Sequence, residues 1–103
     1  VLLFGEACDN AVILDHMREL KADPAFANRC RFYKVPDMFE DWKQLMLMSV
    51  CDNNIVANST FSWWGAYLNQ NPGKIVCYPG TWFGPALKKN DTRDLFPDGW
   101  IKI

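Results

Sequence analysis

The stretch that decides the fold runs from Asn54 to Tyr67 and reads NIVANSTFSWWGAY. Residues 54–57 form a short apolar run that predicts a buried strand. Residues 58–60 carry the side-chain oxygens that favour the start of a helix, which we expect to run to about Asn69. Aromatic residues surround most of this helix, so we expect it to be buried on nearly every side, with Gly65 and Ala66 allowing close approach. The stretch therefore predicts a strand that leads directly into a buried helix.

The same alternation of short apolar runs and helical patterns continues on both sides of this stretch. The spacing of Asp37 and Glu40 is that of a capping box, which predicts a helix from this point. Strands are expected over residues 1–4, 30–35, 54–57 and 74–78, and helices from residue 9 or 10 to Pro24, from 37 to about 52 and from 58 to about 69. Strands that alternate with helices predict an α/β fold with a small doubly wound parallel sheet of about four strands, which is Rossmann-like. We expect residues 1–103 to form one domain, with residues 82–103 as a less regular tail.

Composition and charge exclude several classes of protein. The chain has 103 residues, of which 50% are hydrophobic and 22% charged, which is typical of one soluble domain. Its net charge of −1 disfavours nucleic-acid binding by bulk electrostatics. Apolar runs such as Leu45–Met48 are far shorter than the roughly 20 residues of a membrane-spanning helix. The start of the chain has no signal-peptide pattern, so we expect a cytoplasmic protein.

The cysteine and histidine pattern predicts no metal site. No two of the 4 cysteines have the C-x-x-C spacing, and His16 is the only histidine. Most of the cysteines lie in or beside apolar runs, where a free thiol behaves as a small hydrophobe. We therefore expect free thiols in a reduced protein, and an exposed His16 without a ligand role.

Candidate binding residues follow from the sheet topology. Ligands of doubly wound sheets lie beyond the carboxyl ends of the strands, which here are Gly5–Glu6, Val35–Asp37 and Asn58–Ser62. At Asn58–Ser62, hydroxyl groups and the free amides of a helix start together offer a site for a phosphate that needs no lysine. The alternative is that Ser59 or Thr60 only caps the helix, which contributes about 1 kcal/mol to stability.

The residues around this helix start resemble a known family. Cys51–Leu68, and above all the specific string from Asn58 to Gly65, is similar to the donor-site motif of the alpha-1,2-fucosyltransferases. The likeness runs from about Phe39 to the C-terminus, and Leu3–Glu6 is a weaker match to an earlier strand end. Further similar segments are Leu45–Ser49, Lys74–Val76, Trp82–Phe83 and Pro97–Ile103.

The resemblance implies an inverting, metal-independent glycosyltransferase of the GT-B kind. In such enzymes the C-terminal, Rossmann-like half binds GDP-fucose and the N-terminal half binds the acceptor glycan. The implied partners are thus a nucleotide-sugar donor, a glycan acceptor and an N-terminal half missing from this chain, with no metal or other cofactor. The candidate donor-binding residues are Glu6, Asp41, Gln44, Asn58, Ser59, Thr60, Phe61 and Ser62.

Two departures from the family pattern limit what the chain is expected to do. The family's His-x-Arg-Arg-x-Asp motif, whose arginine meets the leaving diphosphate, is expected upstream of Val1 and does not occur in this chain. We therefore assign no catalytic residue and expect little transfer by the chain alone. Gln44 replaces the acidic residue that the family uses near guanine, and Asp41, one turn earlier, could take over this role. The alternative function is a non-catalytic nucleotide-binding or interaction module derived from such a domain.

Overall fold

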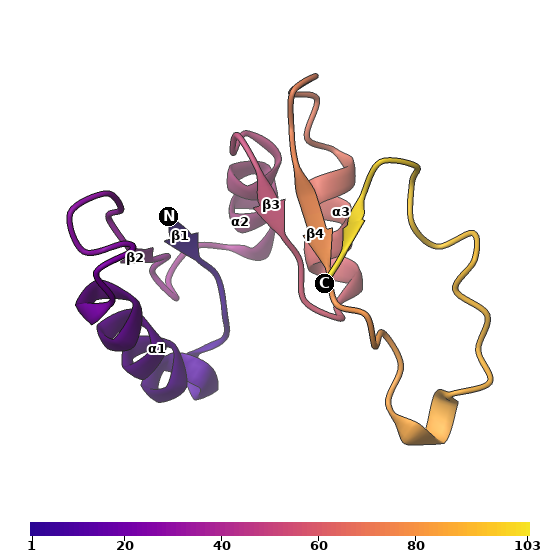
Figure 1. Ribbon diagram of the computed structural model, residues 1–103, viewed down its shortest axis with the longest axis horizontal. Coiled ribbons are helices and arrows are strands. Elements are labelled where there is room, and N and C mark those ends of the chain that lie inside the picture. The colour runs from indigo at the N-terminus through magenta and orange to yellow at the C-terminus, as the bar shows by residue number, and fades with distance from the viewer. The chain divides into compact units, whose positions relative to one another are not determined.

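The computed structural model describes residues 1–103, which fall into two compact units, Val1–Gln44 and Leu45–Ile103. Figure 1 shows the helices and strands of both units along the chain. The order of elements is β1 (Leu2–Leu3), η1 (Ala7–Asp9), α1 (Asn10–Ala22), β2 (Tyr33–Lys34), α2 (Asp41–Ser49), β3 (Asn54–Ile55), α3 (Thr60–Tyr67), β4 (Val76–Tyr78), η2 (Pro85–Leu87) and β5 (Ile101–Lys102). None of these helices has the length and apolar content that crossing a membrane would require.

The first unit is a strand-helix-strand crossover. β1 pairs in parallel with β2, so that Leu2 lies opposite Tyr33. α1 connects the two strands, and its Met17 side chain is buried, as are Phe32 and Val35 around β2. The helix begins at Asn10 and ends before Pro24, as its sequence pattern predicted.

The second unit holds a parallel sheet of three strands in the order β3-β4-β5. α3 connects β3 to β4 and packs on the sheet, because Ala66 of this helix is fully buried against Val56 and Val76. Tyr78, Trp82 and Trp100 are partly buried around this core. The core therefore lies between α3 and the strands that α3 connects.

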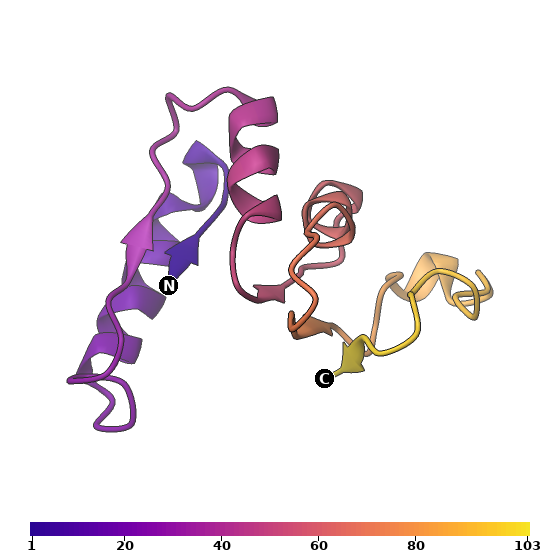
Figure 2. The same cartoon turned by 90° about the horizontal axis from the view of Figure 1, so that it is seen from above.

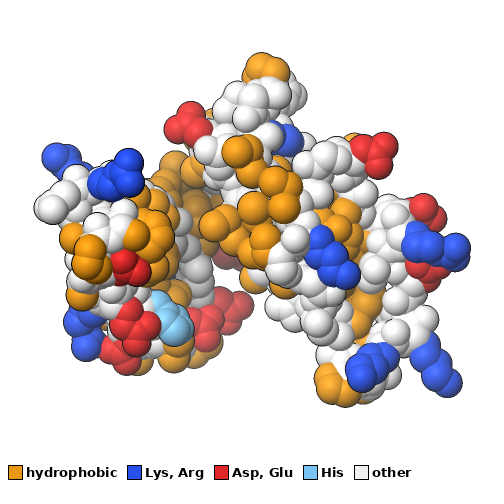
Figure 3. All heavy atoms as spheres, viewed as in Figure 1, with side chains coloured by type: hydrophobic (Ala, Val, Ile, Leu, Met, Phe, Trp, Pro, Cys, Tyr) orange, Lys and Arg blue, Asp and Glu red, His pale blue; other side chains and the backbone are white.

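Only one face of this sheet is covered within the second unit. α3 lies on one side of β3, β4 and β5 in Figure 2. Ile55, Cys77 and Ile101 are neighbours in register on the other face, where Ile55 is 80% and Ile101 48% exposed. Figure 3 shows hydrophobic side chains gathered over β3 and β4 on this uncovered face.

A network of asparagine side chains anchors α3 to the sheet. The side chain of Asn69, just after the helix, is buried and donates hydrogen bonds to the carbonyl oxygen of Cys51 at 2.6 Å and to Asn54 Oδ1 at 2.8 Å. Lys74 Nζ donates to the carbonyl oxygen of Ala66 at 2.8 Å, where a cation complements the negative end of the helix dipole. These contacts hold the end of α3 against the start of β3.

The predicted α/β class with parallel strands is confirmed, and the strands form two sheets of two and three strands. β5 was not predicted, because it lies in the stretch expected to be an irregular tail. This strand is only two residues long, and its pairing with β4 joins segments far apart in the sequence. Short strands of this kind leave almost no periodic signal.

Two predictions about the helices are wrong. The capping box does not form, because α2 begins at Asp41 and the Asp37 carboxylate instead accepts hydrogen bonds from Lys34 and Asn10. α3 is not buried on nearly every side, since Trp64 is 49% and Tyr67 51% exposed. A fully apolar helix surface predicts burial, but in this structure only one side of α3 packs on the sheet.

Candidate functional site

The start of α3 lies at the carboxyl end of β3, the edge where parallel sheets bind ligands. Ser59 precedes the helix in extended backbone, with φ −134° and ψ 128°. The first amide that donates within the helix is that of Trp63, to the carbonyl oxygen of Ser59 at 3.0 Å. The amides of Thr60, Phe61 and Ser62 therefore have no acceptor in the protein.

The side chains at this turn do not cap the helix. Ser59 is the N-cap residue, but its hydroxyl makes no capping hydrogen bond, so the capping alternative is not what the structure shows. The Ser62 hydroxyl instead donates to carbonyl oxygens of the turn itself, that of Ser59 at 3.0 Å and that of Ala57 at 3.3 Å. Asn58 and Thr60 are exposed. Ser62 thus supports the shape of the turn, while the Asn58 and Thr60 side chains are open to a ligand.

This arrangement is suited to binding an anion. Three unpaired amides point out of the helix start, where the helix dipole is equivalent to roughly half a positive charge. Backbone amides in this position bind phosphate groups in many α/β proteins without a basic side chain. The exposed Thr60 hydroxyl adds a further donor beside them.

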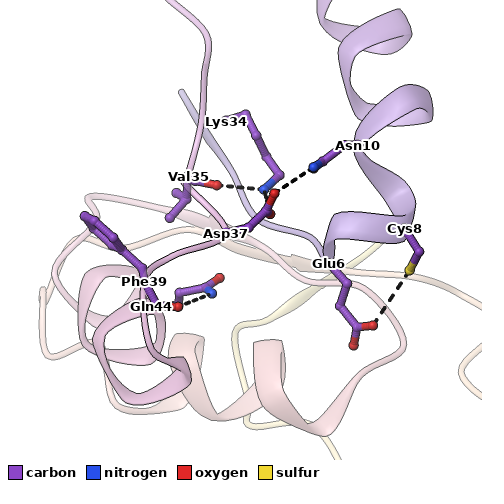
Figure 4. A network of polar contacts seen from close by, with 8 residues as sticks. All are labelled: Glu6, Cys8, Asn10, Lys34, Val35, Asp37, Phe39 and Gln44. Carbon is purple, nitrogen blue, oxygen red and sulfur yellow. Dashed lines mark hydrogen bonds and ion pairs between the residues drawn. The ribbon is translucent and has the colours of Figure 1, made fainter.

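The other predicted binding residues lie in the first unit and are described within it. Figure 4 shows Glu6 beyond the end of β1, where its Oε2 accepts a hydrogen bond from the Cys8 thiol at 3.8 Å. Gln44 Nε2 donates to the carbonyl oxygen of Phe39 at 2.9 Å, which leaves the amide oxygen free to accept. Asp41 is exposed at the first residue of α2, one turn before Gln44.

The carboxyl end of β2 carries an ion pair that sequence reasoning missed. Lys34 Nζ donates to Asp37 Oδ1 at 2.6 Å and to the carbonyl oxygen of Val35 at 2.7 Å (Figure 4). Hydrogen bonds from Lys34 and then from Asn10 hold the pKa of the Asp37 carboxyl below its usual value. The spacing of the pair, three residues apart with opposite charge, is the signal that could have found it.

A cavity at the carboxyl ends of β4 and β5 was also missed. It has a volume of about 370 Å³, and its walls include Gly80, Trp82, Trp100 and Lys102. A second cavity of about 410 Å³ lies at the amino end of β4, beside Asn69 and Lys74. The first cavity was missed because its walls belong to residues 78–102, which were expected to be mostly irregular.

The free thiols and the exposure of His16 agree with the sequence prediction. All four cysteines are free, and His16 is exposed, with its Nδ1 atom 3.3 Å from Glu19 Oε2. The negative charges of Asp9 and then Glu6 raise the pKa of the Cys8 thiol, and burial raises that of Cys51. No three His, Cys, Asp or Glu side chains are clustered so that they could hold a metal ion.

The fold and this site define a parallel α/β protein whose crossover helix begins, with free amides, at the ligand-binding edge of the sheet. The chain belongs to glycosyl transferase family 11, whose family model matches residues 15–103. It is 42% identical over 84 residues to the O-antigen biosynthesis glycosyltransferase WbnK of Escherichia coli, covering 80% of this chain and 26% of that protein. It is 37% identical over 59 residues to an alpha-1,2-colitosyltransferase of Escherichia coli, covering 57% of this chain and 20% of that protein.

The chain thus spans about a fifth to a quarter of the length of these curated relatives. No solved structure matches it significantly. The family expected from the Asn58–Gly65 string is confirmed, and the match begins well before Phe39, where the likeness was expected to start. Asp41, Gln44 and the α3 start lie within the matched residues, whereas Glu6 lies outside them.

Proposed function

We propose that this chain is the donor-binding part of an inverting, metal-independent alpha-1,2-fucosyltransferase-like glycosyltransferase that uses GDP-fucose. Membership of glycosyl transferase family 11 supports the reaction class. The observation that carries the proposal is the start of α3, where three backbone amides have no acceptor in the protein and the N-cap side chain leaves them free.

In this proposal the diphosphate of the donor binds at the start of α3. The amides of Thr60, Phe61 and Ser62 donate to its oxygens, and the hydroxyls of Ser59 and Thr60 add two further donors. Ser62 keeps the turn in shape through its bonds to the carbonyl oxygens of Ser59 and Ala57. Asn58, which is exposed beside the turn, borders the same site.

The same groups assist the reaction. An acceptor hydroxyl attacks the anomeric carbon of fucose from the side opposite the diphosphate, and the new C–O bond forms while the bond to the diphosphate oxygen breaks. GDP leaves with the bonding electron pair, and the hydroxyl proton passes to a base that we do not assign to this chain. Donors that meet the charge developing on the leaving group each contribute about a hundred- to thousandfold in rate in comparable sites.

The remaining donor-binding residues are proposed to recognise the nucleoside. The Asp41 carboxylate can accept hydrogen bonds from both N–H groups on one edge of guanine, whereas the free amide oxygen of Gln44 can accept fewer. Asp41 therefore takes the guanine role and Gln44 supports it, with Glu6 near the nucleoside at the end of β1. Transfer by this chain alone is expected to be absent, because the family's arginine motif does not occur in it.

A second candidate donor carries colitose in place of fucose. It is favoured by the similarity to a protein named as an alpha-1,2-colitosyltransferase. In both cases the donor diphosphate binds at the start of α3, and the two candidates differ in the sugar that the donor carries.

Isothermal titration calorimetry with the 103-residue chain tests the proposal, with GDP, GDP-fucose, UDP and ATP as ligands in EDTA buffer. Thr60→Pro removes one amide and one hydroxyl while keeping the helix, because proline suits the first helical position after an extended residue such as Ser59. Charge-assisted hydrogen bonds contribute about 1.5–3 kcal/mol, so this variant is expected to bind GDP roughly ten- to a hundredfold more weakly. Thr60→Val loses only the hydroxyl, so its affinity for GDP is expected to lie between those of Thr60→Pro and the wild type.

Ser49→Ala is the matched control, since its hydroxyl bonds only to the carbonyl oxygen of Met46. Circular dichroism confirms that each variant folds. Absence of binding to every nucleotide by the folded wild type overturns the proposal, as does a Thr60→Pro variant with unchanged affinity. A requirement for added Mg²⁺ overturns its metal-independent part.

A further inference from the structure

The cavity at the carboxyl ends of β4 and β5 has no role in the site described so far. Its volume is about 370 Å³, and none of its walls comes from Asn58–Ser62. Aromatic side chains form much of the wall, including Trp82 and Trp100, and the charged side chains are Arg93, Asp98 and Lys102. It is therefore a separate hollow at the edge of the sheet from which α3 begins.

The wall of this cavity is joined to the first half of α3. Trp63 Nε1 donates a hydrogen bond to the carbonyl oxygen of Leu95 at 2.9 Å. The rings of Trp63 and Trp100 pack with their centroids 5.8 Å apart. These contacts hold the segment that lines the cavity against the helix whose start is the proposed phosphate site.

Strand register places Lys102 on the same side of the sheet as α3. Lys102 lies opposite Tyr78, two residues beyond the buried Val76, so all three side chains project from the helix-covered face. Lys102 also ends β5, so it lies at the carboxyl edge of the sheet. Adjacent strands lie about 4.8 Å apart, which puts β5 roughly 10 Å from β3 across this edge.

The Lys102 ammonium group is unpaired, unlike the other cation of the cavity. Arg93 forms an ion pair with Asp91, whereas Lys102 makes no salt bridge and no side-chain hydrogen bond. Its stem runs over Gly80, where a Cβ atom would lie 3.1 Å from Lys102 Cε and 3.1 Å from the carbonyl oxygen of Ile103. Glycine at this position therefore leaves room for the lysine stem beside the cavity.

We propose that this cavity is a second phosphate subsite, in which Lys102 binds the phosphate group of the nucleotide sugar that lies farther from the α3 amides. The inference rests on the proposed function and adds a residue to it. An ammonium group on a flexible stem forms charge-assisted hydrogen bonds to phosphate oxygens. Lys102 thus supplies, from this chain, a positive charge at the diphosphate that the α3 amides alone do not carry.

Calorimetry of the 103-residue chain with GDP, inorganic pyrophosphate and guanosine tests this role. Lys102→Gln is expected to weaken GDP and pyrophosphate binding about tenfold and to leave guanosine binding unchanged, since guanosine has no phosphate. Lys102→Arg is expected to restore most of the affinity, which a merely structural role would not predict. Lys88→Gln is the matched control, because Lys88 is exposed, lies in the same unit and does not line the cavity.

The outcomes separate this inference from the proposed function. If Lys102→Gln binds GDP like the wild type while Thr60→Pro does not, the α3 site stands and the Lys102 subsite is overturned. If Lys102→Gln and Lys88→Gln lose the same amount of GDP affinity, the subsite is also overturned, because the loss then reflects only the overall charge of the protein. If pyrophosphate binds in a Lys102-dependent manner but no nucleotide binds, the subsite stands as an anion site and the proposed function fails. If the folded chain binds none of these ligands, both are overturned.

Discussion

At the scale of single residues, the hydrogen-bond partners of Asp37 are set by the tertiary structure. Asp37 has the spacing of a helix cap with Glu40, yet its carboxylate accepts from Lys34 at 2.6 Å and from Asn10 Nδ2 at 2.7 Å. Asn10 comes from the start of α1, which lies 27 positions away in the sequence. Asp37 therefore makes two hydrogen bonds at the end of β2, one of them charge-assisted, and does not cap α2, which begins at Asp41.

This pairing predicts a pH-dependent contribution of Asp37 to stability. The folded state lowers the carboxyl pKa, chiefly through the hydrogen bond from Lys34, below the value of about 3.9 for an unfolded Asp. Between the two pKa values the unfolded chain binds more protons, so stability rises with pH there. The contribution is therefore complete above about pH 4 and is lost as the pH falls through the lowered folded pKa.

Thermal unfolding of Asp37→Asn against wild type between pH 2 and pH 7 measures this effect. We expect the variant to unfold at a lower temperature at neutral pH, and the gap to narrow steadily below about pH 4. Asp94→Asn, at an exposed residue without a side-chain partner, is expected to show no such gap. A difference in unfolding temperature that stays constant down to pH 2 contradicts the ion-pair assignment.

At the scale of elements, the packing of α2 against α3 depends on one glycine. Gly65 is buried in α3, and a Cβ atom there would lie 2.7 Å from Met48 Cβ and 2.8 Å from Met48 Sδ. The expected close approach at Gly65 is therefore confirmed. The next residue of the helix, Ala66, is 0% exposed, so small side chains at both positions let α3 pack closely on its neighbours.

Gly65→Ala separates helix propensity from packing. Alanine in a helix interior is favoured over glycine by about 1 kcal/mol, but overpacking a tight contact costs about 1–3 kcal/mol. Because the contact is with the backbone-proximal Cβ of Met48 as well as its flexible end, we expect a net loss of up to roughly 2 kcal/mol in urea unfolding. Gly84→Ala, where a Cβ atom would meet nothing within 4 Å, is the control and is expected to change stability little. A more stable Gly65→Ala variant would show that Met48 moves aside without cost.

At the scale of the whole molecule, charge predicts which large partners the protein does not bind. Its 11 basic and 12 acidic residues give a net charge of −1. The anion-binding features proposed here are local, consisting of helix amides and one lysine, and do not form a basic surface that tracks a phosphate backbone.

We therefore expect no shift of duplex DNA or RNA in a gel mobility assay at low salt, where such electrostatic binding would be strongest. The same protein preparation should bind GDP in calorimetry, and this binding is the positive control that the protein is folded and able to bind a ligand. Strong retention of DNA that weakens steeply with salt would contradict this expectation and would indicate a basic surface instead of a local site.

The amino-acid sequence by itself determined the α/β class, the parallel strand-helix-strand order, the start of α3 near Ser59 and the family. These features depend on local periodicity and on a specific string of residues, which are written along the chain. The tertiary structure alone decided which strands pair, where β5 lies, which partner Asp37 takes and which side chains of α3 stay exposed. It also brought Gly80 and Lys102 together, because contacts between distant segments follow from the burial of the whole chain and leave no local pattern to read.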